Sequence, residues 1–245
     1  MHVRRSAAFV ALVSVAVLTT VVVGGAAEAG KDPRYRVRIV NLTDGQPLTP
    51  PVIAVHRSGF DLFEVGDLAS VGVMQVAENG NVPNLVSALG QARGVAEVVA
   101  GAEPLVPSDL PGSANHPDRA SFVIEAPRHA RFISLVSMLI CTNDGFTGIN
   151  HVWLPEHVGD SRAIAANGYD AGTEINTEDF ADIVPPCQAL VGVTGPEPGT
   201  GASNPALLEG GVIRHHPGIA GGVDLVRSVH GWDDPVVRIQ ITRVA

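Results

Sequence analysis

The sequence predicts an all-β protein, built as an antiparallel β-sandwich with short inserted helices. Segments near both ends of the chain, 35–42 and 234–245, alternate apolar and polar residues as half-buried strands do. Further strong strand patterns lie between residues 120 and 155. Helical patterns are short and confined to residues 66–92. Because strands do not alternate regularly with long helices, a parallel α/β sheet is disfavoured.

Residues 1–29 have the pattern of a signal peptide, which leaves 30–245 as a single predicted domain. The chain opens with the basic stretch MHVRR, continues with an uncharged apolar run, and reaches the small-residue triplet AEA at 27–29. The alternative is a retained membrane anchor, since the apolar run is nearly long enough to cross a bilayer. We expect an exported chain, either secreted or held in the periplasm or cell envelope, without membrane insertion after cleavage.

The first half of the mature chain is expected to place two helices between strands. Segments 35–42 and 52–57 have strand patterns. Residues 66–80 show helix-like apolar spacing and end in Asn-Gly, and residues 81–92 begin with the helix-opening residues Asn and Pro. Residues 94–102 return to a strand pattern.

The second half is expected to hold the core strands and the long loops. Residues 101–120 form a loop rich in Pro and Gly. Strands are then predicted at 120–126, 131–141 and 148–155, an irregular region at 157–190, and a Gly/Pro/Ser-rich surface loop at 192–205.

Charge and cysteine content narrow the class of protein. The chain has 25 acidic and 16 basic residues, for a net charge of −9. Since no basic stripe interleaves with aromatic residues, nucleic acid is an unfavourable partner. The two cysteines, Cys141 and Cys187, would reach an oxidising compartment on export, which favours a disulfide over two free thiols.

Acidic residues suggest a calcium site. Asp170 and Glu174 frame the segment DAGTE, in which Gly172 permits a tight turn. Asp144 follows the most apolar predicted strand and would lie at the rim of the sandwich, with Asn143 or backbone carbonyls as further ligands. Oxygen ligands from separate loops suit Ca²⁺, although no EF-hand pattern is present. The alternative is a solvated acidic loop.

The second functional hypothesis is an exported metal-dependent enzyme that uses His215, His216 and His230. Three imidazoles can bind zinc and leave a position for water. Adjacent residues of a strand point opposite ways, however, and the sequence lacks both H-E-x-x-H and G-x-S-x-G. Trp153 and Trp232 suggest either a carbohydrate platform or partly buried packing, and packing is the commoner role of large aromatic residues.

Two stretches resemble the spondin N-terminal domain family. They are RFISLVSMLICTNDGFTGIN at 131–150 and YDAGTE at 169–174. The strand at 35–42 and the predicted helices at 67–89 are similar to the same family. The resemblance implies a non-catalytic antiparallel β-sandwich, related in architecture to C2 domains, that binds a single Ca²⁺ through two acidic loops.

Carried over by motif, the calcium ligands implied here are Asp144, Asp170 and Glu174. The family usually has Asp at the position of Glu174, and Glu is longer and often bidentate, which implies a site of different affinity. Gly145 also stands where the family has an aromatic residue, which is shifted to Phe146. The resemblance further implies a role in extracellular or cell-surface contacts, with a protein or glycan ligand.

Overall fold

The computed structural model describes residues 31–245, so the predicted signal peptide lies outside the described residues. Asp32–Ala245 form one compact unit with two sheets, in which every strand pair is antiparallel. The four-stranded sheet has the order β4 (Arg119–Glu125), β1 (Arg34–Asn41), β10 (Val237–Arg243), β7 (Ser161–Ala166). The six-stranded sheet has the order β3 (Val95–Ala100), β2 (Val52–His56), β5 (Phe132–Met138), β6 (Gly145–Trp153), β8 (Gly168–Asp170), β9 (Arg214–His215). The predicted antiparallel sandwich is confirmed.

The four-stranded sheet buries one face. Burial alternates along β1 and β10, as expected of strands with one face in solvent. Ile39 pairs with Ile239 in the register of these strands, and both side chains are buried. They pack against buried residues of the facing sheet, including Ile53 and Leu135, and this contact forms the core between the sheets.

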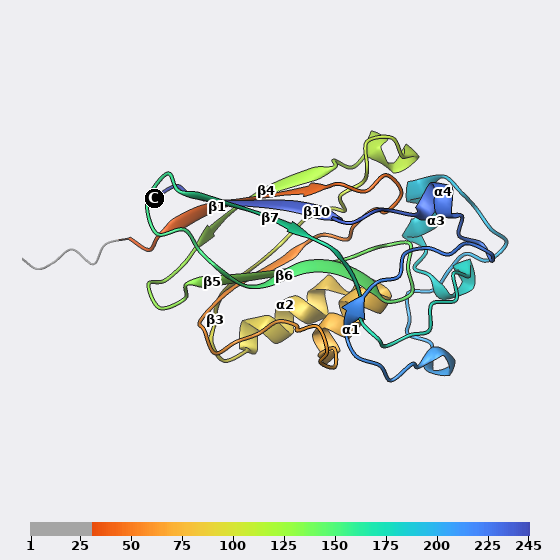
Figure 1. Cartoon of the computed structure of the whole chain (residues 1–245), viewed down its shortest axis with the longest axis horizontal. Helices are drawn as coiled ribbons and strands as arrows, with labels where there is room; N and C mark the ends of the chain where they lie inside the picture. The colour runs from red at the N-terminus through yellow and green to blue at the C-terminus, as the bar shows by residue number, and fades with distance from the viewer. Residues whose placement is uncertain (1–30) are drawn as a thin grey trace, which may run out of the picture. The chain divides into compact units, whose positions relative to one another are not determined.

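The six-stranded sheet is covered on both faces. All seven residues of β5 are buried, because the other sheet covers one face and two helices cover the other. Figure 1 shows α1 (Val71–Asn79) and α2 (Val82–Gln91) on the side of β5 and β6 that faces away from β1 and β10. Val76 and Leu85 of the helices belong to the same buried cluster as Val136 of β5. The predicted helices therefore form a third layer.

Local signals set the ends of these helices. The Ser70 hydroxyl accepts the Val73 N–H at 3.3 Å at the start of α1, and Gly80 ends the helix with a left-handed φ of 62°. The Asn81 side chain then accepts the Asn84 N–H at 3.3 Å and opens α2. The turn between the two helices is thus encoded in neighbouring residues.

The prediction of a long irregular region at 157–190 was wrong. The region contains β7 and β8, the short 3-10 helix η2 (Phe180–Asp182) and helix α3 (Pro186–Val191). The sequence of β7, SRAIAA, has one β-branched residue, so its strand propensity is weak. Pairing with β10 along Ser161–Ala166 stabilises this strand despite its weak intrinsic propensity.

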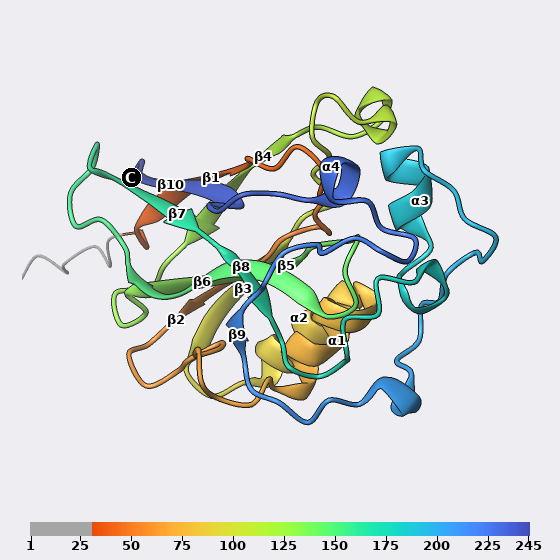
Figure 2. The same cartoon turned by 45° about the vertical axis from the view of Figure 1, so that its right-hand side comes forward.

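The loop that follows β5 and the segment that follows β8 leave the sheet at the same end, because Gly145 of β6 pairs with Asp170 of β8. We call residues 139–144 and 170–179, which include the last residue of β8, the rim. Helices α3 and α4 (Arg227–His230) lie at that end of the sandwich (Figures 1 and 2). Among the described residues, no helix combines the length and apolarity required to span a bilayer.

Candidate metal centre

Strand pairing brings two of the predicted ligands, Asp144 and Asp170, together at the rim. The Ala171 N–H donates to the backbone carbonyl of Asp144 at 3.1 Å, next to the paired residues Gly145 and Asp170. Both aspartate side chains are fully buried, at 0% exposure. Two ionisable groups thus lie close together where water does not reach them.

The two oxygens of the Asp144 carboxylate have different surroundings. Oδ2 accepts the N–H of Thr173 at 2.7 Å, the N–H of Glu174 at 3.1 Å and the Thr173 hydroxyl at 3.2 Å. Oδ1 is buried and has no hydrogen-bond partner within residues 31–245. A buried polar atom without a hydrogen-bond partner is energetically unfavourable, so a ligand bound to this oxygen would stabilise the site.

Asp170 has partners on both oxygens. Its Oδ1 accepts the Gly172 N–H at 2.8 Å, and its Oδ2 accepts the Asn176 amide at 2.7 Å and Arg214 Nη2 at 3.1 Å. The same Arg214 nitrogen lies 2.8 Å from Glu209 Oε1. Asp170 is therefore held in place by one turn, one amide and one cation.

The proximity of the two aspartates affects their ionisation. Burial and, to a smaller extent, the charge of Asp170 raise the pKa of Asp144 to about 6, although hydrogen bonds from Glu174 and Thr173 oppose the change. Burial and a neighbouring like charge both disfavour the ionised form. A bound cation would relieve both effects.

Glu174, the third predicted ligand, has its carboxylate in another group of acids. Its Oε1 accepts the Asn204 N–H at 2.8 Å, and the side chain is buried. Burial, opposed by the Asn204 hydrogen bond and assisted by the charges of Glu78, Asp144 and Asp182, raises the pKa of Glu174 to about 7. We call Glu78, Glu174 and Asp182 the Glu78 group.

The Glu78 group receives its hydrogen bonds from the end of the Gly/Pro-rich loop. The Ser203 hydroxyl donates to Glu78, and the Asn204 side-chain amide donates to Asp182 at 3.3 Å. Within residues 31–245, no set of three His, Cys, Asp or Glu side chains is arranged to hold a metal ion. The Asp144–Asp170 pair supplies two carboxylates, and Ca²⁺ completes its six to eight oxygens from carbonyls and water as well.

Asn143, expected as a further ligand, has a different role. Its Oδ1 accepts the Thr177 N–H at 3.1 Å, and its Nδ2 donates to the Thr177 hydroxyl at 3.1 Å. The Glu178 N–H, at a residue with a left-handed φ of 57°, also donates to Asn143 Oδ1. Asn143 thus fixes the turn that ends the acidic rim segment.

Two glycines permit close packing of the backbone at the rim. A Cβ on Gly145 would lie 2.4 Å from the Thr142 hydroxyl oxygen, which accepts the Gly145 N–H at 2.8 Å. This contact explains why glycine stands at 145 and the aromatic residue, buried Phe146, follows it. Gly172 has a φ of +69°, and a Cβ there would lie 2.6 Å from the carbonyl oxygen of Val212.

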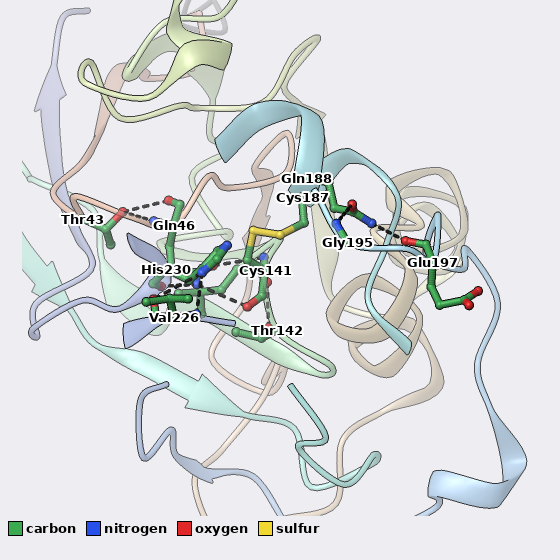
Figure 3. The surroundings of a disulfide bond; sticks show 11 residues. Thr43, Gln46, Cys141, Thr142, Cys187, Gln188, Gly195, Glu197, Val226 and His230 are labelled. Carbon is green, nitrogen blue, oxygen red and sulfur yellow. Dashed lines mark hydrogen bonds between the residues drawn. A yellow bond between two sulfur atoms is a disulfide. The ribbon is translucent and has the colours of Figure 1, made fainter. Parts of the chain in front are cut away.

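The predicted disulfide is confirmed. Cys141 and Cys187 are bonded, with their Cα atoms 5.1 Å apart, and the bond joins the loop after β5 to α3 (Figure 3). The Gln46 side chain accepts the Cys141 N–H at 3.1 Å and donates to the carbonyl of His230 in α4. All three predicted ligands lie between the bonded cysteines in the sequence.

The three histidines of the alternative hypothesis do not meet. His215 is exposed and lies against Tyr169 on one side of β9, with ring centroids 5.3 Å apart. His216 points the other way, beside Trp232 at 5.0 Å, and His230 is fully buried in α4. The alternation of side chains along a strand separates the first two, as the sequence suggested.

The two tryptophans do not share a surface either. Trp153 packs beside Phe132, with ring centroids 4.4 Å apart, and the Arg131 guanidinium lies 5.1 Å from its ring. The half-buried Trp232 packs over Gly168. Since they line separate cavities, they do not form one carbohydrate platform.

Sequence reasoning missed the partners of both acidic groups. Arg214 contacts Asp170, and Asn204 contacts Glu174, from positions far along the chain. One signal was available for Arg214, because it is the only Lys or Arg between Arg162 and Arg227. A single basic residue in a long acidic region is a natural counter-charge for it.

Comparison with known families identifies the fold. The family model Spondin_N matches residues 47–180, a narrower span than the resemblance, and this span contains Asp144, Asp170 and Glu174 but none of His215, His216 and His230. Curated protein sequences gave no match. Because the family match covers more than half of the chain, the chain belongs to the spondin N-terminal domain family, whose members are extracellular and generally non-catalytic.

Proposed function

We propose that this chain is an extracellular, non-catalytic module that binds one Ca²⁺ ion at the rim, through Asp144 and Asp170. The observation that carries the proposal is the buried Oδ1 of Asp144, which has no hydrogen-bond partner among the described residues and belongs to a carboxylate next to fully buried Asp170. The donor set is made of hard oxygens, which Ca²⁺ prefers. Family membership supports the extracellular, non-enzymatic part of the proposal.

Calcium would supply the positive charge that two buried carboxylates need. Asp144 Oδ2 already holds the N–H groups of Thr173 and Glu174, so an ion at Asp144 would fix the positions of both rim segments together. Binding to the folded state alone raises stability by mass action. Extracellular modules bind calcium with dissociation constants of about 10⁻⁴ to 10⁻³ M, and we expect a value in that range.

Glu174 is the third ligand of the proposal, and it would contribute less than the aspartates. Its carboxylate is bonded to the Asn204 N–H and shares its surroundings with Glu78 and Asp182. Joining the ion would cost the hydrogen bond to Asn204. We therefore expect Glu174→Gln to weaken calcium binding less than Asp170→Asn.

We further propose that the ordered rim contacts an extracellular ligand, either a protein or a glycan, in an adhesive role. Two apolar side chains support this step. Ile175 is 50% exposed and Leu208 is 70% exposed, and both lie beside Glu174, since Glu174 and Leu208 form a β-bridge. Calcium at the rim would fix the segment that carries Ile175, and a fixed apolar contact costs less entropy on binding.

The test is a melting curve of the exported chain in EDTA, in CaCl₂ and in ZnCl₂. We expect calcium to raise the melting temperature by several degrees and zinc to have little effect. Asp144→Asn and Asp170→Asn should abolish the calcium response. The matched control is Asp109→Asn, which removes an exposed acid from the loop between β3 and β4 and should leave the response intact.

Three results would contradict the proposal. They are a parent chain whose melting temperature ignores calcium, a calcium response that survives both aspartate substitutions, and a response to zinc alone. The last result would revive the enzyme hypothesis and direct attention to His215, His216 and His230.

A further inference from the structure

Arg214 occupies a specific place beside the proposed calcium site. Its Nη2 lies 3.1 Å from Asp170 Oδ2, and the Asp170 side chain is fully buried while that of Arg214 is 41% exposed. Across residues 31–245, Arg214 is the one basic side chain that forms an ion pair with Asp144 or Asp170, and its partner is Asp170. The guanidinium therefore stands between the buried carboxylate and solvent.

A buried carboxylate needs a counter-charge. Burying an ionised group without a partner is costly, and the cost grows when a second carboxylate such as Asp144 lies close by. In the structure, Arg214 supplies one positive charge to this pair. A calcium ion would supply two charges to the same oxygens.

We propose that Arg214 is a counter-cation that competes with calcium for Asp170 and thereby lowers the calcium affinity of the rim. This inference rests on the proposed calcium function. It assigns a regulatory role to a residue outside the 47–180 span that matches the family model. Removal of Arg214 should tighten calcium binding, whereas removal of an ordinary structural partner of Asp170 would weaken it.

Glu209 gives the arginine a second partner. Its carboxylate oxygens lie 2.8 and 2.9 Å from the same Arg214 nitrogen. The backbone of Glu209 is held to the rim, because its N–H donates to the Thr173 carbonyl at 3.1 Å. When calcium takes Asp170, Arg214 would keep its ion pair with Glu209, so the exchange leaves no cation unpaired.

The sizes of these effects follow from Coulomb's law. A single charge a few ångströms from a divalent ion, at the high effective dielectric of a protein surface, changes the binding constant by about ten-fold. Since the Arg214 guanidinium is partly exposed, salt should reduce the difference.

The experiment is calorimetric titration of the exported chain with CaCl₂, on the parent, Arg214→Ala and Arg214→Lys. We expect Arg214→Ala to bind about ten-fold more tightly, while Arg214→Lys, which keeps the charge, stays within about three-fold of the parent. The matched control is Arg131→Ala. It removes an arginine that pairs with Glu156 at 2.7 Å, at the other end of β5 from Asp144, and should leave calcium affinity unchanged.

A second variant, Glu209→Gln, should change the affinity in the opposite direction. It leaves Arg214 with Asp170 as its remaining acidic partner among the described residues, so calcium should bind several-fold more weakly. In the Arg214→Ala background the same substitution should have much less effect, since the two residues act as a unit. If Glu209→Gln weakened calcium binding equally in the parent and in Arg214→Ala, the proposed movement of Arg214 from Asp170 to Glu209 would be overturned.

The failure of the inference can be told apart from the failure of the calcium function. If the parent binds calcium and Arg214→Ala binds it equally or more weakly, the competition is overturned and the calcium site stands. If the parent shows no binding, both fall. Melting temperatures in EDTA give an independent measurement. Arg214→Ala should lower the melting temperature by several degrees more than Arg131→Ala does, because it leaves Asp170 buried without a cation.

Discussion

Two groups of buried or partly buried acids lie at or beside the rim, and they are stabilised differently. In the Asp144–Asp170 pair, one oxygen has no partner within the described residues and another contacts the Arg214 cation. In the Glu78 group, hydrogen bonds come from Ser203 and Asn204 of the neighbouring loop. The first group has an unused oxygen beside a cation of the chain, and the second is satisfied by uncharged donors.

The difference shows why acidic composition alone does not locate a metal site. Both groups lie in one acidic region, and the pKa values of Asp144 and Glu174 are both raised, chiefly by burial. What separates them is the identity of the donors. A carboxylate whose oxygens already accept hydrogen bonds from amide and hydroxyl donors contributes less to an ion site than one with a buried, unused oxygen.

The largest predicted effect is loss of the disulfide, which encloses residues of both acidic groups. The bond closes a loop with a sequence separation of 46 residues. On the chain-entropy estimate, the double variant Cys141→Ala/Cys187→Ala should lose about 4 kcal/mol of unfolding free energy. Guanidinium denaturation measures this loss. The calcium response should weaken as well, and an undiminished response would show that the rim is held without the bond.

A smaller effect, confined to the Asp144–Asp170 pair, is expected from Gly172→Ala. The new Cβ would need a left-handed backbone and would collide with the backbone of Val212. We expect a loss of about 2 kcal/mol, with weaker calcium binding, because the Gly172 N–H also holds Asp170. The matched control is Gly159→Ala, whose φ is +93° but whose Cβ meets nothing within 4 Å. Equal losses in the two variants would exclude the collision as the cause.

The pH dependence of stability should distinguish the two groups. The pKa of Asp144 rises from an ordinary 3.8 to about 6 on folding, and that of Glu174 from 4.5 to about 7. Between these limits the folded chain holds more protons than the unfolded chain. Without calcium, unfolding free energy should therefore fall as pH rises from about 4 to 7, by roughly 1.4 kcal/mol per unit for each group at the steepest.

Urea denaturation in EDTA at several pH values measures this slope. Asp144→Asn should remove the part between about pH 4 and 6, and Glu174→Gln the part that extends to about pH 7. Saturating calcium should reverse the Asp144 part, since the ion binds the ionised carboxylate. If calcium left the pH dependence of the unfolding free energy unchanged, the ion would have to bind away from Asp144.

The smallest effect is expected in the Glu78 group. Ser203→Ala removes the hydroxyl that donates to Glu78 and should cost about 1 kcal/mol without altering calcium affinity. Ser113→Ala is the control, because its hydroxyl makes one exposed bond to the Ser108 carbonyl. Chemical denaturation and a calcium titration test both expectations. A change in calcium affinity with Ser203→Ala would show that Glu78 also takes part in the calcium site.

Much of the fold could be predicted because its main signals are local. Alternation marked β1 and β10, an apolar run marked β5, the terminal Asn-Gly marked the end of α1, and Asn81 marked the start of α2. Strands β7, β8 and β9 escaped prediction. They are short or weak in β-propensity. They form because β7 pairs with β10, β8 pairs with β6, and β9 pairs with β8.

The acidic residues of the candidate site could be singled out from the sequence, and their surroundings could not. Asp144 follows an apolar strand and Asp170 begins a glycine turn, and the structure brings the two together. The partners of the acids, Arg214 and Asn204, come from a loop-rich stretch 30 or more residues away in sequence. Such contacts depend on how the chain folds back, which no local pattern encodes.

The placement of Arg214 has an evolutionary consequence. The carboxylates of the rim lie within the 47–180 span that defines family membership, whereas Arg214 and Glu209 lie beyond it. In the proposed mechanism, calcium binding and its adjustment therefore belong to separate stretches of sequence. Under that mechanism, a lineage would change the calcium concentration at which such a module becomes ordered by exchanging one residue in the second stretch, and the ligands in the first would not need to change.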